Sequence, residues 1–298
     1  MLQGRPAATW ERLFINDKAY IQLAMKLNDT KGVPKIIKKL DKTVAGLHIA
    51  TDGKTIFRTT DKIPIANLPD DVSDLKKLSS IMHERYTRPL SQSLASIGAN
   101  KETIVLNLNH SAGDGMFLQN LFTQLKSDKE LDYEPTIIPD EQALSDEIKR
   151  YKGGPTKFAS VDPEITKIHV TPKVASKFSS SHAKDIMTYK VHKKLKNMTE
   201  YYWINWILAC SALEGRINKC GIATCVNLRP FVKKADLSVT SCFSHVNATA
   251  IPKPNMTVGE IMKELRFNFD KNVKNGTQYG EFKALYPINE FIRYGHWN

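Results

Sequence analysis

His110 lies at a position in the sequence where its side chain could take part in a reaction. His110 follows a β-prone apolar run at 103–108, and Asp114 comes four positions later. From residue 115 to 125, apolar side chains recur at helical spacing, so the chain predicts a strand, a short turn and a helix. At such a junction a side chain can face a cleft. A neutral imidazole is well suited to take the proton of a hydroxyl or amine that attacks a thioester carbonyl, so the pattern favours acyl transfer with His110 as general base.

Asp114 is interpreted as a structural residue rather than a second catalyst. A carboxylate in the first turn of a helix gains from the helix dipole and can pair with an arginine. Gly113 and Gly115 are expected to let the backbone turn tightly on either side of it. The alternative is a polar strand end with an aspartate that only caps the following helix.

The spacing His-x-x-x-Asp-Gly at residues 110–115 resembles the signature of the chloramphenicol acetyltransferase-like superfamily. This superfamily includes alcohol acetyltransferases, plant acyl-CoA-dependent acyltransferases and peptide-synthetase condensation domains. The resemblance implies an α/β fold with mixed sheets flanked by helices, in two subdomains with a cleft between them. Further segments that resemble it are a strand at 21–27, a Lys-rich helix at 33–45, a hairpin at 47–58, a strand region at 88–97, a helix at 198–213 and a Val-Asn-Leu-Arg-Pro strand at 222–230.

The resemblance also implies roles for individual residues. The general base falls on His110, while Asp114 and Gly115 support the site and Arg229, in the Leu-Arg strand, pairs with Asp114. The alternative for Arg229 is a solvated arginine at a strand end. The implied donor is an acyl-CoA such as acetyl-CoA, the acceptor is a small alcohol or amine, and no bound cofactor or metal is expected.

The chain departs from the superfamily in its length. No Asp-Phe-Gly-Trp-Gly segment and no late Ser-Asn-x-Gly strand occur in the 298 residues, so we expect the second subdomain to be incomplete. The expected division is 1–150 and 151–298, with the Pro/Gly/Lys-bearing run 149–157 as linker. An incomplete second half predicts weak activity of the isolated chain and self-association or a partner chain. Two other functions stay open: a condensation unit that uses carrier-bound acyl groups, and a catalytically inactive relative that acts as a binding protein.

The composition is that of a globular protein, with 41% hydrophobic and 25% charged residues. No apolar run reaches the about 18 residues that a membrane span needs, and the N-terminus has no apolar signal region, which favours a cytoplasmic location. The four cysteines are then expected to be free thiols. Trp203, Trp206 and Ile207 are expected in a core.

The net charge of +12 could attract coenzyme A phosphates, an acidic carrier protein, nucleic acid or a membrane face. Two lysine clusters could supply it: Lys35, Lys38, Lys39 and Lys42, and Lys190, Lys193, Lys194 and Lys196. The alternative for each is a solvated helix face. Without a glycine-rich phosphate loop, zinc finger or aromatic RNA-binding signature, no specific nucleic-acid partner is expected.

The remaining cysteines and histidines favour structural roles. Cys220 with Cys225, and Cys242 with His245, lack the spacing of a zinc site and lie in apolar, strand-like segments. Cys210 and Cys225 are therefore interpreted as core residues. His245 and His48 are interpreted as packed or surface histidines rather than further bases.

Overall fold

A computed structural model describes residues 4–59, 64–127, 137–138, 140–156, 196–215, 219–232, 237 and 239–285. The described residues form two compact units. One takes the chain up to Lys152, the segment Asn227–Phe243 and the residues from Phe282, and the other takes Gly153–Val226 and Ser244–Glu281. The division at 1–150 and 151–298 stays a prediction, and the lysines at 190, 193 and 194 lie outside the described residues.

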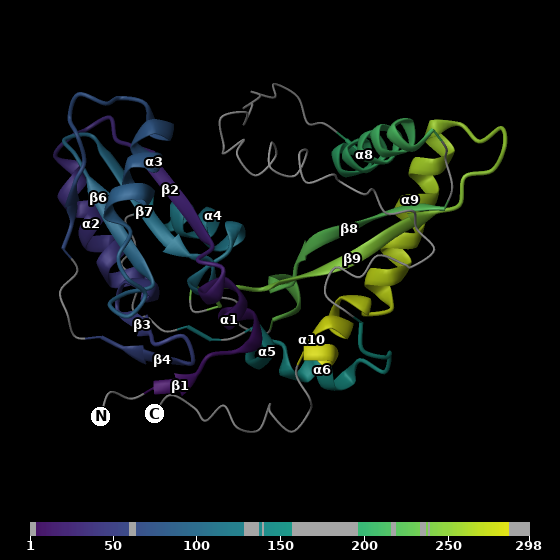
Figure 1. The fold of residues 1–298 in the computed structure, drawn as a ribbon, viewed down its shortest axis with the longest axis horizontal. Coiled ribbons are helices and arrows are strands. Elements are labelled where there is room, and N and C mark those ends of the chain that lie inside the picture. The colour runs from purple at the N-terminus through teal and green to yellow at the C-terminus, as the bar shows by residue number, and fades with distance from the viewer. Residues whose placement is uncertain are drawn as a thin grey trace. The chain divides into compact units, whose positions relative to one another are not determined.

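A four-stranded mixed sheet is the centre of the first unit. Its order is β2 (Tyr20–Lys26), β7 (Thr103–Asn109), β6 (Ala95–Ala99) and β5 (Ala66–Asn67) (Figure 1). β7 runs antiparallel to both of its neighbours, whereas β5 and β6 are parallel. Every residue of β7 is buried, as expected of a central strand that is covered on both faces. The predicted strand at 103–108 is therefore confirmed and extends by one residue to the position before His110.

A second, three-stranded sheet lies at the N-terminal end of the chain. It has the order β1 (Gly4–Pro6), β4 (Thr55–Arg58) and β3 (Ile49–Thr51), with antiparallel pairing throughout. The hairpin predicted at 47–58 is formed by β3 and β4, which meet at a turn where Gly53 has a φ of 93°. Only glycine adopts such a φ without strain. The strand region expected at 88–97 is shorter than predicted, because β6 begins only at Ala95, after the turn that contains Pro89.

Two helices of the first unit match helices that the sequence predicted. They are α1 (Thr9–Asn16), α2 (Gly32–Thr43), α3 (Leu75–Tyr86), α4 (Gly115–Leu125), α5 (Asp140–Ala143) and α6 (Ser145–Arg150), with the short 3-10 turns η1 (Ala45–Leu47), η2 (His110–Ala112) and η3 (Arg229–Phe231). The Lys-rich helix predicted at 33–45 is α2, and the helix predicted after the histidine is α4.

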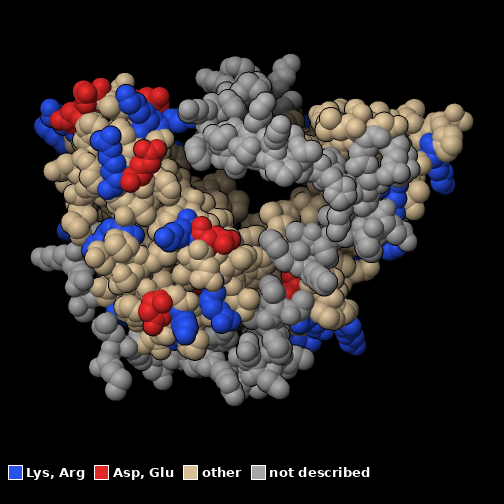
Figure 2. Space-filling model, viewed as in Figure 1, with Lys and Arg blue, Asp and Glu red and all other residues tan. Residues whose placement is uncertain are grey.

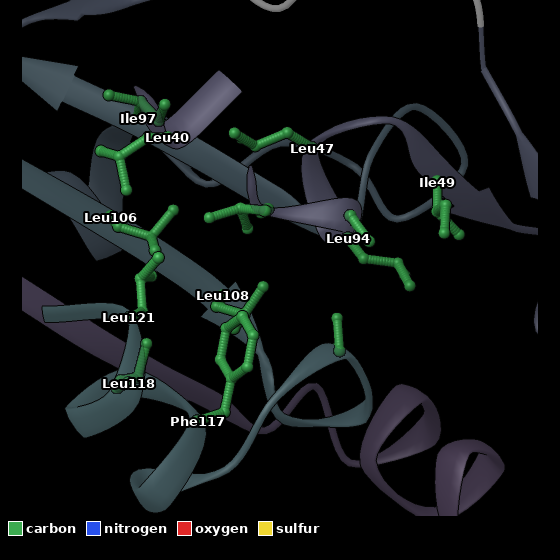
Figure 3. Packing of buried hydrophobic residues seen from close by; sticks show 14 of the residues in the cluster. Leu40, Leu47, Ile49, Leu94, Ile97, Leu106, Leu108, Phe117, Leu118 and Leu121 are labelled. Carbon is green, nitrogen blue, oxygen red and sulfur yellow. The ribbon is translucent and has the colours of Figure 1, made fainter. Parts of the chain in front are cut away.

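The core of this unit fixes the junction between β7 and α4. Leu106 and Leu108 of β7 point toward Phe117 and Leu121 of α4, and all four side chains are at most 1% exposed (Figure 3). Leu40 of α2 belongs to the same cluster. Truncating one such leucine typically costs about 2–5 kcal/mol of unfolding free energy. The end of β7 and the start of α4 are thus held together by close packing on both sides of the intervening turn.

The second unit is built on two long helices and two long strands. They are α8 (Met198–Glu214), α9 (Val258–Lys274), β8 (Cys220–Asn227) and β9 (Phe243–Ala250), followed by η4 (Thr277–Tyr279) and α10 (Gly280–Leu285). β8 and β9 pair with each other, and their last and first residues, respectively, belong to the first unit. The helix predicted at 198–213 is confirmed as α8. Among the described residues no helix has both the length and the apolar character to cross a membrane.

One core prediction for α8 is wrong. Trp203 and Ile207 are 2% and 5% exposed, but Trp206 is 58% exposed. Residues four apart share a helix face, so Trp203 and Ile207 face α9 together while Trp206 lies on another side. α8 carries apolar residues all round, so the pattern did not indicate which face is buried.

Candidate active site around His110

His110 begins η2 directly after β7, and its main chain is held on two sides. Its backbone N–H donates to the carbonyl oxygen of Ala19 at 2.8 Å. The preceding Asn109 accepts from the backbone N–H of Ser111 at 3.1 Å and donates to the carbonyl oxygen of Phe14 at 3.3 Å. The turn is therefore tied to the α1 end and to the segment that leads into β2.

The imidazole ring lies on an aromatic wall. The His110 and Phe14 rings stack with centroids 4.2 Å apart and planes 11° apart, and the Phe243 ring centroid lies 5.9 Å from that of His110. Trp10 in turn stacks on Phe14 with centroids 6.0 Å apart. The His110 side chain is half-buried. The wall keeps water from one ring face and fixes the orientation of the imidazole by packing.

The two ring nitrogens of His110 differ in their surroundings. Nδ1 is buried and has no hydrogen-bond partner among the described residues. Nε2 is not among the buried side-chain atoms that lack a partner. In the described part of the chain no carboxylate bonds to this ring, so packing rather than a charged partner orients it.

Asp114 caps α4 and pairs with Arg229. Its Oδ1 accepts from the backbone N–H of Phe117 at 2.8 Å, as an N-cap residue does. Its Oδ2 accepts from Arg229 Nη1 and from the backbone N–H of Cys242, both at 2.9 Å. The structure therefore brings Asp114 and Arg229 together, whereas the structural role of Asp114 stays a prediction.

Arg229 is buried rather than solvated. Its side chain is 7% exposed, and its Nη2 donates to the carbonyl oxygens of Val239 at 3.0 Å and Thr240 at 2.9 Å. Because the charge has a carboxylate and two carbonyl oxygens around it, its desolvation is compensated. The interpretation of Arg229 as a solvated arginine is wrong, and so is its expected place within a strand. β8 ends at Asn227, and Arg229 begins the η3 turn.

The expected role of the two glycines is wrong in its physical detail. Gly113 has an extended backbone, with φ 171°, and Gly115 is not among the glycines with positive φ. A Cβ at Gly113 would lie 2.6 Å from Leu108 Cδ2 and 2.7 Å from Phe117 Cδ1, so close packing excludes a side chain there. A Cβ at Gly115 would meet none of the described atoms within 4 Å. Open space therefore lies beside the first residue of α4.

One lysine of the cluster on α2, Lys39, has a structural role. Lys39 Nζ donates to the carbonyl oxygens of Leu125 and Ser127, which lie at the end of α4, where a cation compensates the helix dipole. On the face that Figure 2 shows, Lys and Arg side chains over the first unit lie among Asp and Glu side chains. On this face the positive charge is therefore dispersed rather than gathered into one patch.

None of the four cysteines is in a disulfide bond, and two of them are not in the core positions that the sequence predicted. Cys220 and Cys242 are buried, Cys210 is half-buried and Cys225 is exposed. The prediction that Cys210 and Cys225 are core residues is therefore wrong, because an apolar strand sequence does not show which residues of a two-stranded sheet are covered. In the part of the chain that the structure describes, no group of three His, Cys, Asp or Glu side chains is arranged to hold a metal ion.

The fold is similar to that of three kinds of solved structure: a polyketide synthase associated protein, a starter condensation domain and TRI101. Polyketide synthase associated protein 5 from Mycobacterium tuberculosis is 14% identical with a TM-score of 0.56, covering 93% of this chain and 75% of the other. A variant of the starter condensation domain of rhizomide synthetase RzmA is 10% identical with a TM-score of 0.56, covering 96% and 77%.

F. graminearum TRI101, solved with coenzyme A and T-2 mycotoxin, is 15% identical with a TM-score of 0.52, covering 98% of this chain and 80% of the other. Comparison with protein-family models and with curated protein sequences gave no match. The likeness is therefore one of fold, and the mixed α/β architecture predicted from the sequence is confirmed.

Proposed function

We propose that the protein transfers an acyl group from an acyl-CoA thioester to a small alcohol or amine, with His110 as general base. The observation that carries the proposal is the placement of His110. Its imidazole is half-buried on an aromatic wall, with Nδ1 enclosed and Nε2 left to meet an acceptor. The likeness in fold to TRI101, solved with coenzyme A and a small molecule, supports a thioester donor.

In this reaction a single group, His110, first takes a proton and then returns it. His110 Nε2 takes the proton of the acceptor hydroxyl or amine as its oxygen or nitrogen attacks the thioester carbonyl carbon. A tetrahedral oxyanion forms and collapses, which breaks the bond between carbon and sulfur. The departing thiolate takes the proton from the imidazolium and leaves as free coenzyme A. This route forms no covalent acyl-enzyme at His110.

Asp114 and Arg229 act on this reaction through position. The carboxylate holds the start of α4 and, through Arg229 and Cys242, the segment that carries Phe243. Phe243 packs against the imidazole, and His110 belongs to the η2 turn that leads to Asp114, so the ion pair holds the histidine and part of its aromatic wall in position. We propose that Asp114 and Arg229 are positioning residues and that the open space beside Gly115 admits substrate.

The test is acetyl-CoA turnover with a panel of alcohols and amines, followed as release of the free thiol. With the acceptor that works best, His110→Ala should lower kcat/KM by about 10²–10⁴-fold, the usual contribution of a general base. His48→Ala is the matched control, because His48 is a surface histidine of the same unit that bonds to Asp41. Turnover that survives in His110→Ala would contradict the proposal, and transfer only from carrier-bound acyl groups would point to a condensation unit instead.

A further inference from the structure

A second group of reactive side chains lies in the second unit, on elements far apart in the sequence. Cys225 comes from β8, His245 from β9 and Glu281 from the first turn of α10. His245 Nε2 lies 3.1 Å from Cys225 Sγ, and His245 Nδ1 lies 3.3 Å from Glu281 Oε2. Each nitrogen of one imidazole therefore has its own partner, a thiol on one side and a carboxylate on the other. This is the geometry of a nucleophile, its base and the group that orients the base.

The burial of the three side chains suits that chemistry. The side chains of His245 and Glu281 are 12% and 3% exposed, whereas Cys225 is exposed. Ser244 Oγ lies 2.9 Å from Glu281 Oε2 and 2.7 Å from the carbonyl oxygen of Gln278, which fixes the carboxylate in place. The orienting groups are thus mostly enclosed in the unit, whereas Cys225 is exposed.

The electrostatics of His245 agree with this arrangement. Burial lowers the pKa of His245, but its hydrogen bonds to Cys225 and Glu281, together with the charges of these groups, outweigh burial and raise the pKa to about 9. The imidazole therefore keeps its proton at neutral pH. A protonated imidazole at this distance can donate a hydrogen bond to the sulfur of Cys225.

The other cysteines lack these features. Burial, followed by the charge of Glu264, raises the pKa of Cys220 to about 11. Cys242 is buried, and Cys210 is half-buried on α8. Thus, among the four, Cys225 combines exposure with a hydrogen bond from the half-buried imidazole of His245 to its sulfur.

We propose that Cys225, His245 and Glu281 form a second reactive site, in which Cys225 is a nucleophile that accepts an acyl group from a thioester. The nucleophile is independent of His110, which belongs to the other unit. The choice of a thioester as donor rests on the proposed function. Exchange between a thiolate and a thioester replaces one carbon–sulfur bond with another and needs no oxidant or reductant.

Every bond and proton in the exchange is accounted for by Cys225, His245, Glu281 and the thioester. Cys225 Sγ attacks the carbonyl carbon while its proton is held by His245 Nε2. The new carbon–sulfur bond forms, the bond to the leaving thiol breaks, and the leaving thiolate takes the proton from His245. The products are S-acyl-Cys225 and a free thiol. Glu281 keeps Nε2 directed at the sulfur and stabilises the imidazolium.

The experiment measures where the full-length chain becomes acetylated. The reduced protein is incubated with acetyl-CoA at neutral pH and quenched in acid, and peptide mass spectrometry gives the rate of acetylation at each cysteine. Cys225 should react about tenfold or more faster than Cys210, since Cys225 is exposed and paired with an imidazole, whereas Cys210 is half-buried. Alkylation by iodoacetamide should show the same order without any acyl donor.

Variants then test whether the three residues act together. His245→Gln should slow acetylation of Cys225 by about 10²-fold. Glu281→Gln keeps the size of the side chain but removes its charge, and should slow acetylation by a smaller factor. The circular dichroism of each variant is compared with that of the original protein to check that it folds. If His245→Gln does not fold, the acetylation rate of Glu281→Gln decides. Cys210→Ser is the matched control and should leave the rate at Cys225 unchanged.

The outcomes separate this site from the proposed function. Acetylation of Cys225 that persists in His110→Ala, together with loss of transfer to the acceptor, supports two independent sites. Acetylation of Cys225 without transfer to any acceptor in the original chain supports this site and refutes the proposed function. The inference is overturned if Cys225 reacts with acetyl-CoA and iodoacetamide no faster than Cys210, or if folded His245→Gln and Glu281→Gln variants react at the original rate.

Discussion

The replacement of Asp114 by asparagine isolates the ion pair beneath the candidate site. Asp114 accepts three hydrogen bonds: one caps α4 through Phe117, and two tie it to Arg229 and the backbone of Cys242. Asparagine caps helices about as well as aspartate, so Asp114→Asn should leave the cap nearly intact. The carboxylate charge opposite Arg229 is lost, while the Arg229 guanidinium stays buried at 7% exposure.

A buried charge deprived of its partner costs about 3–5 kcal/mol, so Asp114→Asn should lower the free energy of unfolding by that amount. Asp114→Ala also loses the cap and should cost about 1 kcal/mol more. Urea unfolding followed by circular dichroism measures both values. Because the chain has two compact units, the transition of the first unit must be resolved from that of the second before free energies are compared.

Asp74 offers a matched control for this measurement. It is the N-cap of α3 and accepts from the backbone N–H of Lys76 at 2.8 Å, and no ion pair to it occurs within the described residues. Asp74→Asn should therefore change stability by less than about 0.5 kcal/mol. The double variant Asp114→Ala/Arg229→Ala should lose less stability than the two single variants added together. Additive losses, or an equal effect of Asp74→Asn and Asp114→Asn, would refute the ion-pair argument.

Three further predictions follow from individual sites. Gly113→Ala should destabilise the protein by about 1–3 kcal/mol through overpacking against Leu108, whereas Gly115→Ala should fold normally; equal thermal stabilities would contradict the packing argument. The hydrogen bond from Arg266 lowers the pKa of Glu200 below its ordinary value of 4.5. The pair therefore stabilises the folded protein fully above pH 4.5, and this stabilisation is lost as the pH falls through the lowered pKa of Glu200. The difference in unfolding free energy between the original chain and Glu200→Gln should therefore be constant at neutral pH and shrink in acid; a constant difference down to the acid range would count against the pair. The purified chain should self-associate in sedimentation experiments, because large side chains of α8 such as Trp206, 58% exposed, remain open to solvent, and a monomer at all concentrations would contradict this.

Much of the local structure could be predicted from the sequence, because it depends on residues that are close together in the chain. The apolar run 103–108 and the helical spacing after residue 115 predict β7 and α4. The position of His110 at their junction follows from these patterns alone. The pairing of Asp114 with Arg229 was available only through the resemblance to a superfamily, since the two residues are 115 positions apart.

Other features were decided by the tertiary structure. The wall behind His110 combines Phe14 of α1 with Phe243 of β9, and the second reactive site combines residues of β8, β9 and α10. Neither set has a sequence spacing that indicates contact, because side chains from separate elements meet only when those elements pack. Burial depended on packing in the same way, because the sequence of α8 is apolar on all sides and only its contact with α9 determines which side is covered. For this reason Cys225 and Trp206, apolar in their sequence context, lie exposed.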